Sequence, residues 1–244
     1  MKNPQLHPYL NMQCSLHDVF PTLTFDRVEA PDMSVGSTFF GTDPVHENLE
    51  TAQHRLDLFQ QQHSNGLIAN GYLEARSFYN TDRYQRSTSN GKEYRNIHLG
   101  TDFWVPARTP LHSPLPGKVV ISHNNDIHKD YGPLVVLEHR WNEHLFYTLY
   151  GHLSEDSLAN APIGKQIEKG TQIGWIGAAA ENGDWVPHLH FQILTHLLGN
   201  TENYPGTAYP SELDHWMELC PNPDLLFKEH LPQGPAVRLA PSWS

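Results

Sequence analysis

The sequence predicts a mainly β protein, with an antiparallel sheet as its core and a partly helical extension before it. From about residue 94, short apolar or β-branched stretches alternate with glycine-containing turns, and little helical pattern lies between them. One amphipathic stretch precedes this region, and both ends of the chain are irregular and rich in proline. At 244 residues, the chain is long enough for one large domain with an extension.

The N-terminal extension, residues 1–91, is expected to contain one helix at about 44–64. Apolar residues recur there at three- and four-residue spacing and form a single apolar stripe: Leu49, Ala52, Leu56 and Phe59. Asp43 before Pro44 is a suitable N-cap, and Asn65-Gly66 is a stop signal. We expect the apolar stripe to pack against the rest of the protein.

The sheet core is expected over residues 92–200. Its strands are predicted at Lys118–His123, Leu134–His139, Leu145–Leu149, Gln172–Ile176 and His188–Leu194. Trp141-Asn142-Glu143 would connect two of them as a hairpin. Residues 201–244 form a proline-rich tail that is expected to pack on the core, with a short helix at Glu212–Leu219.

The composition excludes several classes of partner. Lysine and arginine number 16 against 27 acidic residues, so the formal net charge is −11 and no basic surface for nucleic acid or anionic lipid is expected. No apolar run approaches the roughly 20 residues of a transmembrane helix. The first 20 residues lack the apolar segment of a secretory signal, which favours the cytoplasm. The alternative is a periplasmic or exported protein whose leader is missing from this sequence.

The two cysteines, Cys14 and Cys220, lie near opposite ends of the chain. Two cysteines do not make a disulfide framework, so we expect free thiols, with a single disulfide between the ends as the alternative.

Histidines number 17, and a few of them fall into a pattern typical of a metal site. His188 and His190 are two residues apart on a predicted strand, so both side chains point to one face. His98 and Asp102 can converge where the chain bends at Gly100, because glycine permits a close approach. His98, Asp102 and one histidine of the pair would supply two nitrogens and one oxygen, the ligand set of a catalytic zinc site.

A further histidine, His152, follows Gly151 at the end of a predicted strand. With three residues on the metal, His152 and the other histidine of the pair remain to act as base, acid or oxyanion stabiliser. The helical zinc motif HExxH, in which a glutamate is the base, does not occur in the sequence.

These segments resemble the lysostaphin/LytM-type zinc metallopeptidases of family M23, whose pattern is HxxxD, then Gly-His, then HxH. The chain reads HLGTD at 98–102, YGHL at 150–153 and PHLHF at 187–191. The glycine-punctuated stretch 164–174 and the turn and strand at 114–120 are also similar to the family's sequence. The resemblance covers about residues 92–196 and implies an M23 peptidase core of the duplicated hybrid motif type.

The resemblance also implies roles for individual residues. His98, Asp102 and His190 would bind one Zn²⁺, and His152 and His188 would be the catalytic pair. Tyr131, Tyr150 and Trp185 are candidate substrate contacts beside them. In some relatives a preceding segment covers the groove and fills the fourth metal position, so residues 1–91 are either such a cover or an ordinary packing extension.

Two departures from the family's pattern concern the groove. The Gly-rich approach to HxH is replaced by residues 178–187, and the usual acidic residue after HxHF is Gln192. Other details are closest to an M23-like module found in larger proteins beside kinase-like and class III aminotransferase domains.

The sequence therefore predicts a zinc metalloendopeptidase that hydrolyses amide bonds in a peptide or peptidoglycan-like substrate. Two alternatives stand beside this prediction. One is a non-catalytic module that keeps the M23 fold and binds a peptide or a partner protein. The other is a hydrolase of small-molecule amides.

Overall fold

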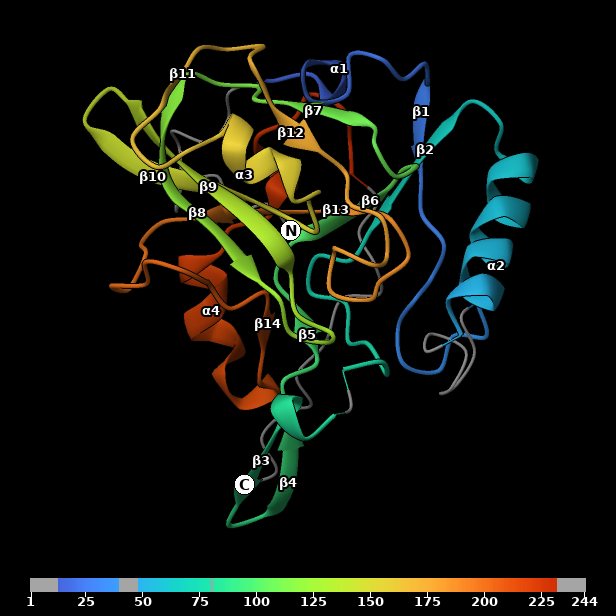
Figure 1. Ribbon diagram of the computed structural model, residues 1–244. Helices are drawn as coiled ribbons and strands as arrows, with labels where there is room; N and C mark the ends of the chain where they lie inside the picture. Colours follow the sequence, from blue (N-terminus) through green and yellow to red (C-terminus); the bar gives the residue numbers. More distant parts are fainter. Residues whose placement is uncertain (1–12, 40–47, 80, 232–244) are drawn as a thin grey trace.

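The computed structural model describes residues 13–39, 48–79 and 81–231. The predicted mainly β, antiparallel fold is confirmed (Figure 1). One eight-stranded sheet dominates, in the order β1-β2-β6-β13-β10-β9-β8-β11. All neighbours in it run antiparallel except β1 and β2, which are parallel. Its strands are β1 (Arg27–Glu29), β2 (Gly66–Asn70), β6 (Thr101–Trp104), β8 (Gly117–Asn125), β9 (Gly132–Trp141), β10 (His144–Gly151), β11 (Gln166–Ile167) and β13 (Leu189–Leu194).

Three two-stranded sheets and several short helices surround the main sheet. The small sheets pair β12 (Gln172–Trp175) with β7 (Pro110–His112), β14 (Thr207–Ala208) with β5 (Ile97–His98), and β3 (Gln85–Thr88) with β4 (Gly91–Tyr94). The α-helices are α1 (Leu16–Val19), α2 (Leu49–Gln62), α3 (Asp156–Asn160) and α4 (Leu213–Leu219). Single 3-10 turns occur at η2 (Asp82–Tyr84), η3 (Pro210–Glu212) and η4 (Pro223–Leu225).

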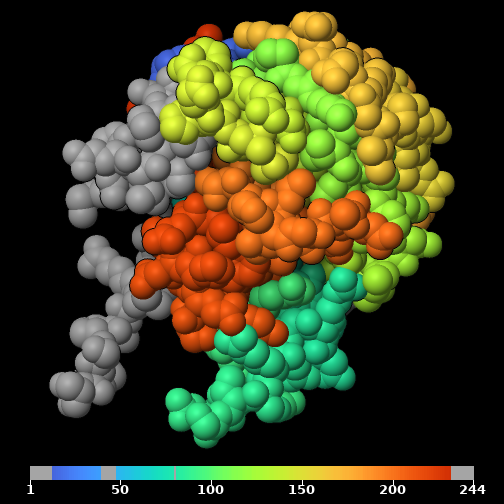
Figure 2. All heavy atoms as spheres, turned by 90° about the vertical axis from the view of Figure 1, so that its left-hand side faces the viewer, coloured from blue at the N-terminus to red at the C-terminus, as the bar shows by residue number. Residues whose placement is uncertain are grey.

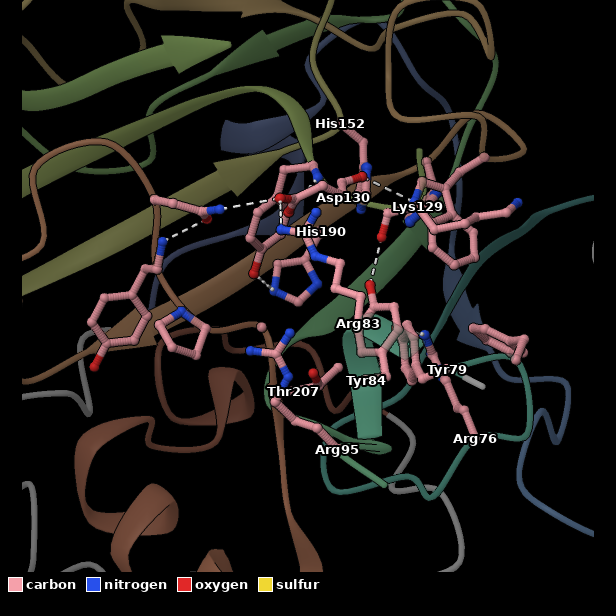
Figure 3. A pocket seen from close by; sticks show the side chains of 18 of the residues that line it. Arg76, Tyr79, Arg83, Tyr84, Arg95, Lys129, Asp130, His152, His190 and Thr207 are labelled. Atoms are coloured by element: carbon pink, nitrogen blue, oxygen red, sulfur yellow. Dashed lines mark hydrogen bonds and ion pairs between the residues drawn. The ribbon is translucent and has the colours of Figure 1, made fainter. Parts of the chain in front are cut away.

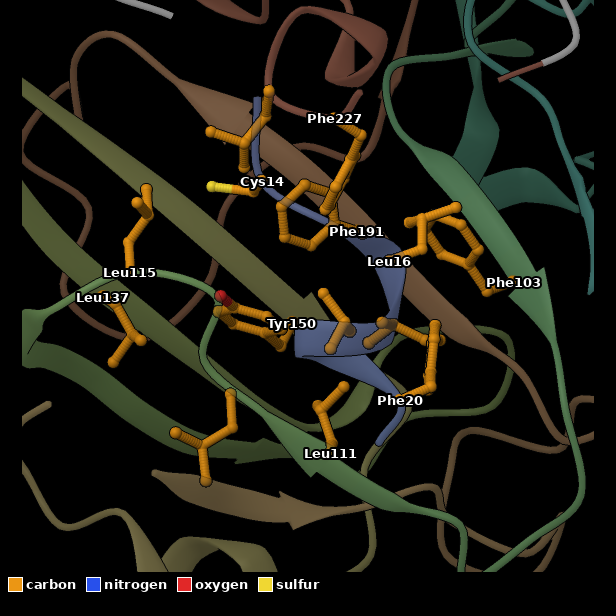
Figure 4. Close-up of a cluster of buried hydrophobic side chains, with 14 of the residues drawn as sticks. Cys14, Leu16, Phe20, Phe103, Leu111, Leu115, Leu137, Tyr150, Phe191 and Phe227 are labelled. Carbon is orange, nitrogen blue, oxygen red and sulfur yellow. The ribbon is translucent and has the colours of Figure 1, made fainter. Parts of the chain in front are cut away.

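The two faces of the main sheet bury separate apolar clusters, as its alternating pattern requires. On β10, Phe146 and Tyr150 belong to one cluster, whereas Tyr147 and Leu149 belong to the other. The first cluster includes side chains from α1 and from the C-terminal segment, among them Leu16, Phe20 and Phe227 (Figure 4). The second lies under α4 and contains Leu213 and Cys220.

Both ends of the described chain are joined to the core by pairing. Strand β2 of the N-terminal extension is hydrogen-bonded to β6, so the extension contributes two strands to the main sheet. Cys14 forms an isolated bridge with Phe227, and β14 pairs with β5. Cys14 and Cys220 are buried, free thiols, as predicted.

The helix of the extension, α2, begins at Leu49 and ends at Gln62. Asn48 caps it, because its side chain accepts a hydrogen bond from the backbone N–H of Thr51. The predicted cap at Asp43 and Pro44 lies outside the described residues. Ala52 and Leu56 are buried against a third apolar cluster that includes Trp104 and Trp185, which confirms the packing of the apolar stripe.

Figure 2 shows that the β3–β4 hairpin projects from the body of the molecule below the segment that contains α4. Among the described residues, no helix is both long and apolar enough to cross a membrane.

Candidate metal centre and active site

Three strands bring the predicted metal ligands together. Asp102 on β6 lies directly opposite His190 on β13, and His98 ends the short strand β5 just before β6 begins. Nδ1 of His190 is 3.1 Å from Oδ1 of Asp102, and Nε2 of His98 is 2.9 Å from Nδ1 of His190. Nε2 of His98 is 3.3 Å from the same carboxylate oxygen. All three side chains are buried.

The glycine of the HLGTD segment makes this approach possible. A Cβ atom on Gly100 would lie 2.7 Å from the ring of His190 and 2.6 Å from the carbonyl oxygen of Phe191. Any larger residue would therefore displace His190 from its position opposite Asp102. This is the close approach predicted for Gly100 from the sequence.

Outer hydrogen bonds fix the tautomers of the two ligand histidines. Nδ1 of His98 is 3.0 Å from the carbonyl oxygen of Gly71, and Nε2 of His190 is 2.9 Å from Oε1 of Gln192. Because these oxygens are acceptors, each of those nitrogens carries the proton. The inner nitrogens of His98 and His190 then present lone pairs, as ligand histidines do in metal sites.

The donor set fits a metal cation. Two unprotonated nitrogens and one carboxylate oxygen face each other at 2.9–3.3 Å, with no proton available between them. A cation at their centre removes this repulsion, and two imidazoles with one carboxylate are a ligand set that Zn²⁺ takes in catalytic sites. The residues present therefore fit zinc.

The electrostatics of the site favour the forms that bind a metal. Burial opposes ionisation of Asp102, but the neighbouring His98 and Arg76 hold its pKa well below the ordinary value. Burial, with the positive charge of Arg76, lowers the pKa of His98 to about 3. At neutral pH, Asp102 is therefore ionised and His98 is neutral.

The second histidine pair stands beside the ligands. The ring centroids of His152 and His188 are 4.3 Å apart, and Nε2 of His188 is 3.9 Å from Oδ1 of Asp102. Nδ1 of His152 donates to the carbonyl oxygen of Asn182 at 2.9 Å, and Nδ1 of His188 donates to that of Val186 at 2.7 Å. Both rings thus keep an unprotonated Nε2 that can accept a proton.

Burial favours the neutral form of these two histidines, and the backbone and a neighbouring ring fix their positions. Burial lowers the pKa of His188 to about 4 and holds the pKa of His152 well below its ordinary value. His152 has a φ of +63°, a conformation that costs a non-glycine residue free energy and often occurs at functional positions. The indole of Trp104 stacks on His188 at 4.5 Å between ring centroids.

A pocket of about 220 Å³ opens beside the ligands and the histidine pair (Figure 3). The predicted substrate contacts Tyr131 and Trp185 line it, together with His152, His188 and His190. The hydroxyl of Tyr131 is 3.4 Å from Nε2 of His190.

Tyr150 does not line the pocket, so its predicted role as a substrate contact was wrong. Its side chain is 0% exposed and lies in the apolar cluster with Phe191 (Figure 4). Strand alternation points Tyr150 into the core, and the chain then turns at Gly151 and His152. Proximity to His152 in sequence therefore does not place Tyr150 near the pocket.

Arg76, which was not among the predicted site residues, lies against the metal ligands. Its side chain is 1% exposed, and its Nη1 donates to Oδ2 of Asp102 at 2.5 Å. Its Nε donates to Oε2 of Glu74, which is also buried, at 2.8 Å. No sequence signal marks Arg76, because it stands in an irregular segment 26 residues before its partner. Gln192 was predicted only to differ from the acidic residue usual in the family, and its contact with His190 was missed. The period of two along a strand places Gln192 on the same face as His190, so this contact could have been predicted.

The sheet and the buried His-Asp-His group together define a protein with a candidate mononuclear metal centre of hydrolase type. Residues 96–203 match Peptidase family M23, and this part of the chain belongs to that family. The relation to the module that accompanies kinase-like domains stays a prediction.

Curated relatives match a similar region. The chain is 32% identical over 125 residues to the peptidoglycan DD-endopeptidase ShyB of Vibrio cholerae, which covers 51% of this chain and 25% of that protein. It is 30% identical over 105 residues to lysostaphin of Staphylococcus staphylolyticus, which covers 43% of this chain and 20% of that protein. The chain thus spans a quarter or less of the length of these two relatives.

Two solved structures also align with the chain. The catalytic domain of lysostaphin from Staphylococcus simulans aligns with 22% identity and a TM-score of 0.34, over 50% of this chain and 80% of that one. A zinc-containing peptidase from Vibrio cholerae aligns with 24% identity and a TM-score of 0.35, over 54% of this chain and 39% of that one.

Proposed function

We propose that this protein is a zinc-dependent peptidase that hydrolyses amide bonds of peptidoglycan-type peptides. The observation that carries the proposal is the convergence of three lone-pair donors, those of His98, Asp102 and His190, within 3.3 Å of one another. The family of residues 96–203 and the activities named for the two curated relatives support it.

Zinc at this position would supply Lewis-acid activation of water and of the scissile carbonyl group. The chain's own residues then have separate tasks. The unprotonated Nε2 atoms of His152 and His188 face the site, so one accepts a proton and the resulting imidazolium can return it to the leaving amine. Their buried, low-pKa environment keeps both rings neutral before the reaction.

The geometry favours an enzyme over a non-catalytic module of the same fold. A binding module has no need of a second neutral histidine pair whose outer nitrogens are both fixed by backbone carbonyl oxygens. The five side chains expected of an M23 active site lie around one point, and His152 is held there in a strained backbone conformation.

Metal content and hydrolysis test this proposal together. We expect elemental analysis to find about one zinc per chain. Purified peptidoglycan and a panel of its cross-link peptides should be cleaved by the zinc-loaded protein, should resist the chelated protein, and should be cleaved again once zinc is restored. A native protein that binds no stoichiometric metal, or a zinc-loaded protein inert towards the whole panel, would contradict it.

The cytoplasmic location expected from the sequence is a prediction that fractionation of the source cells would test. Recovery of the protein in the periplasm or the medium would contradict it.

A further inference from the structure

The pocket beside the metal ligands has a cationic wall. Among the described residues that line it, four are lysine or arginine and one is aspartate: Arg76, Arg83, Arg95, Lys129 and Asp130 (Figure 3). This is the reverse of the whole chain, whose formal net charge is −11. An excess of one sign of charge in a concave, partly desolvated site attracts ligands of the opposite sign.

Three of the four cations already have polar partners within the protein. Arg76 has Asp102, Arg83 has Asp130, and Lys129 has the carbonyl oxygen of Asp184. Lys129 also stands over the ring of Trp185, with Nζ 4.2 Å from the ring centroid. Nη2 of Arg76 is also a buried donor without a partner, but the same guanidinium already pairs with two carboxylates, those of Glu74 and Asp102. The positive charges of these three residues are therefore at least partly engaged within the protein.

Arg95 differs from the other three because no oxygen acceptor within the described residues is paired with its side chain. Within residues 13–39, 48–79 and 81–231, no carboxylate is paired with its guanidinium, and its buried Nε has no hydrogen-bond partner. The guanidinium lies over the ring of Tyr84, with Cζ 5.3 Å from the centroid. A buried donor without a partner is costly and is often satisfied by a ligand.

The backbone fixes Arg95 relative to the metal ligands. Its N–H donates to the carbonyl oxygen of Tyr84 at 2.6 Å, and Arg95 stands three residues before His98. Figure 3 shows Arg95 and His190 on the same pocket. A cavity of about 220 Å³ is smaller than the roughly 300–1,000 Å³ of common ligand sites, so one short ligand would contact both.

We propose that this pocket binds a free carboxylate of the substrate at Arg95, so that the enzyme cleaves amides next to a carboxyl terminus. This rests on the proposed amide hydrolase. The planar guanidinium matches a carboxylate through two parallel hydrogen bonds, and the small cavity suits the end of a peptide more than its middle. Water adds to the scissile carbonyl, the C–N bond breaks, and the amine leaves with a proton, while the bound carboxylate is unchanged.

A matched pair of substrates tests this recognition. N-acetyl-alanyl-alanine and its C-terminal carboxamide differ only in the charged group, and both should be prepared in the L and D series. We expect the zinc-loaded native protein to prefer the acid by about 10- to 100-fold in kcat/KM, the range of a charge-assisted hydrogen bond. Arg95→Gln should bring this ratio close to one, and Arg95→Lys, which keeps the charge without the fork, should give an intermediate ratio.

Arg108→Gln is the matched control. Arg108 is an exposed arginine paired with the exposed Asp156, and it does not line the pocket. The preference for the acid should be unchanged in this variant. Equal cleavage of the acid and the carboxamide by the native protein would overturn the carboxylate proposal and leave the proposed hydrolase standing.

A binding measurement separates the two proposals if no turnover is seen. Calorimetry with N-acetylalanine and N-acetylalaninamide reports on the pocket independently of catalysis. Preferential binding of the acid, lost in Arg95→Gln, would support the carboxylate site even if hydrolysis fails. Equal or absent binding of both would contradict it. The ratio between two ligands is an internal control for partial misfolding of a variant.

Discussion

The guanidinium of Arg76 donates to Oδ2 of Asp102 at 2.5 Å, while Oδ1 of the same carboxylate faces His98 and His190. The N-terminal extension therefore supplies a residue that binds the outer oxygen of a candidate metal ligand. Gly71, whose carbonyl oxygen accepts from Nδ1 of His98, comes from the same extension. The extension is thus part of the site's support, in addition to packing on the core.

Removing this guanidinium should harm both stability and metal binding. Arg76→Met leaves two buried carboxylates, Asp102 and Glu74, without their cation, and breaking a buried ion pair costs about 3–5 kcal/mol. Loss of an outer partner of a ligand also weakens metal affinity by about 10- to 100-fold. Urea unfolding of the metal-free protein and competitive zinc titration measure the two effects.

The surface pair Arg108 and Asp156 provides the control for Arg76→Met. Its side chains are 54% and 67% exposed, so Arg108→Met should change the free energy of unfolding by no more than about 1 kcal/mol. Similar small effects in both variants would show that the Arg76 pair has no special role.

The two histidine pairs should respond differently to alanine. His190→Ala removes a ligand, so both zinc and activity should be lost. His152→Ala should keep zinc and lose turnover by about 100-fold or more, because it removes a proton-transfer group and no ligand. Elemental analysis and peptide hydrolysis distinguish the variants. His54→Ala, on the exposed side of α2, should change neither quantity, and loss of zinc from His152→Ala would contradict the assignment.

Gln192 should matter through its acceptor oxygen. Its Oε1 faces Nε2 of His190, and its amide nitrogen donates to the carbonyl oxygen of Pro205 at 3.1 Å. Gln192→Leu removes the acceptor and should weaken zinc binding by about 10- to 100-fold. Gln192→Glu keeps the acceptor, so zinc affinity should be retained, but its carboxylate would face the oxygen of Pro205.

The two Gln192 variants should therefore separate affinity from stability. We expect Gln192→Glu to lower the free energy of unfolding of the metal-free protein by about 1–3 kcal/mol, since it leaves a buried oxygen without its donor. Zinc competition against a chromophoric chelator and urea unfolding provide the two measurements. Equal zinc affinity in the leucine and glutamate variants would show that the His190 contact does not tune the metal.

Much of the core was predictable because its signals are local. The strands around Leu134–His139 and His188–Leu194 follow from apolar alternation, and the shared face of His188 and His190 follows from the period of two. The ligand segment HLGTD was recognisable because glycine and ligand residues stand within five positions. These features depend on neighbours in sequence. The structure confirms the strands and brings His98, Asp102 and His190 together, while their role as metal ligands stays a prediction.

The features that were missed depend on distant partners. Strand β2 is buried on both faces, so it has no alternation, and its place beside β6 is set by a contact 30 or more residues away. Arg76 is a charged residue whose burial is tolerable because two buried carboxylates, those of Glu74 and Asp102, pair with it. Tyr150 was misplaced because the turn at His152, with its φ of +63°, separates two residues that are close in sequence.

The buried His139, away from the metal centre, should make the fold sensitive to acid. Its Nδ1 donates to the carbonyl oxygen of Pro116 at 2.8 Å, and its Nε2 accepts from Oγ1 of Thr148 at 2.7 Å. Burial lowers its pKa from 6.5 to about 4, against the weaker, opposite effect of the Pro116 hydrogen bond. Between those two values the unfolded chain binds the proton and the folded chain does not, so the stability from this residue is present above pH 6.5.

That contribution should be lost as the pH falls from about 6.5 to about 4, and it amounts to about 3 kcal/mol for a shift of this size. The measurement is urea unfolding at several pH values with a chelator present, so that loss of metal does not contribute. Other groups that change protonation in this range are the same in native protein and in His139→Gln. The difference in the free energy of unfolding between the native protein and His139→Gln should therefore shrink towards pH 4, because the variant does not take up this proton when it unfolds. If the difference in the free energy of unfolding stays constant from pH 7.5 to pH 4, the pKa of His139 is not lower in the folded protein than in the unfolded chain, which would contradict the prediction.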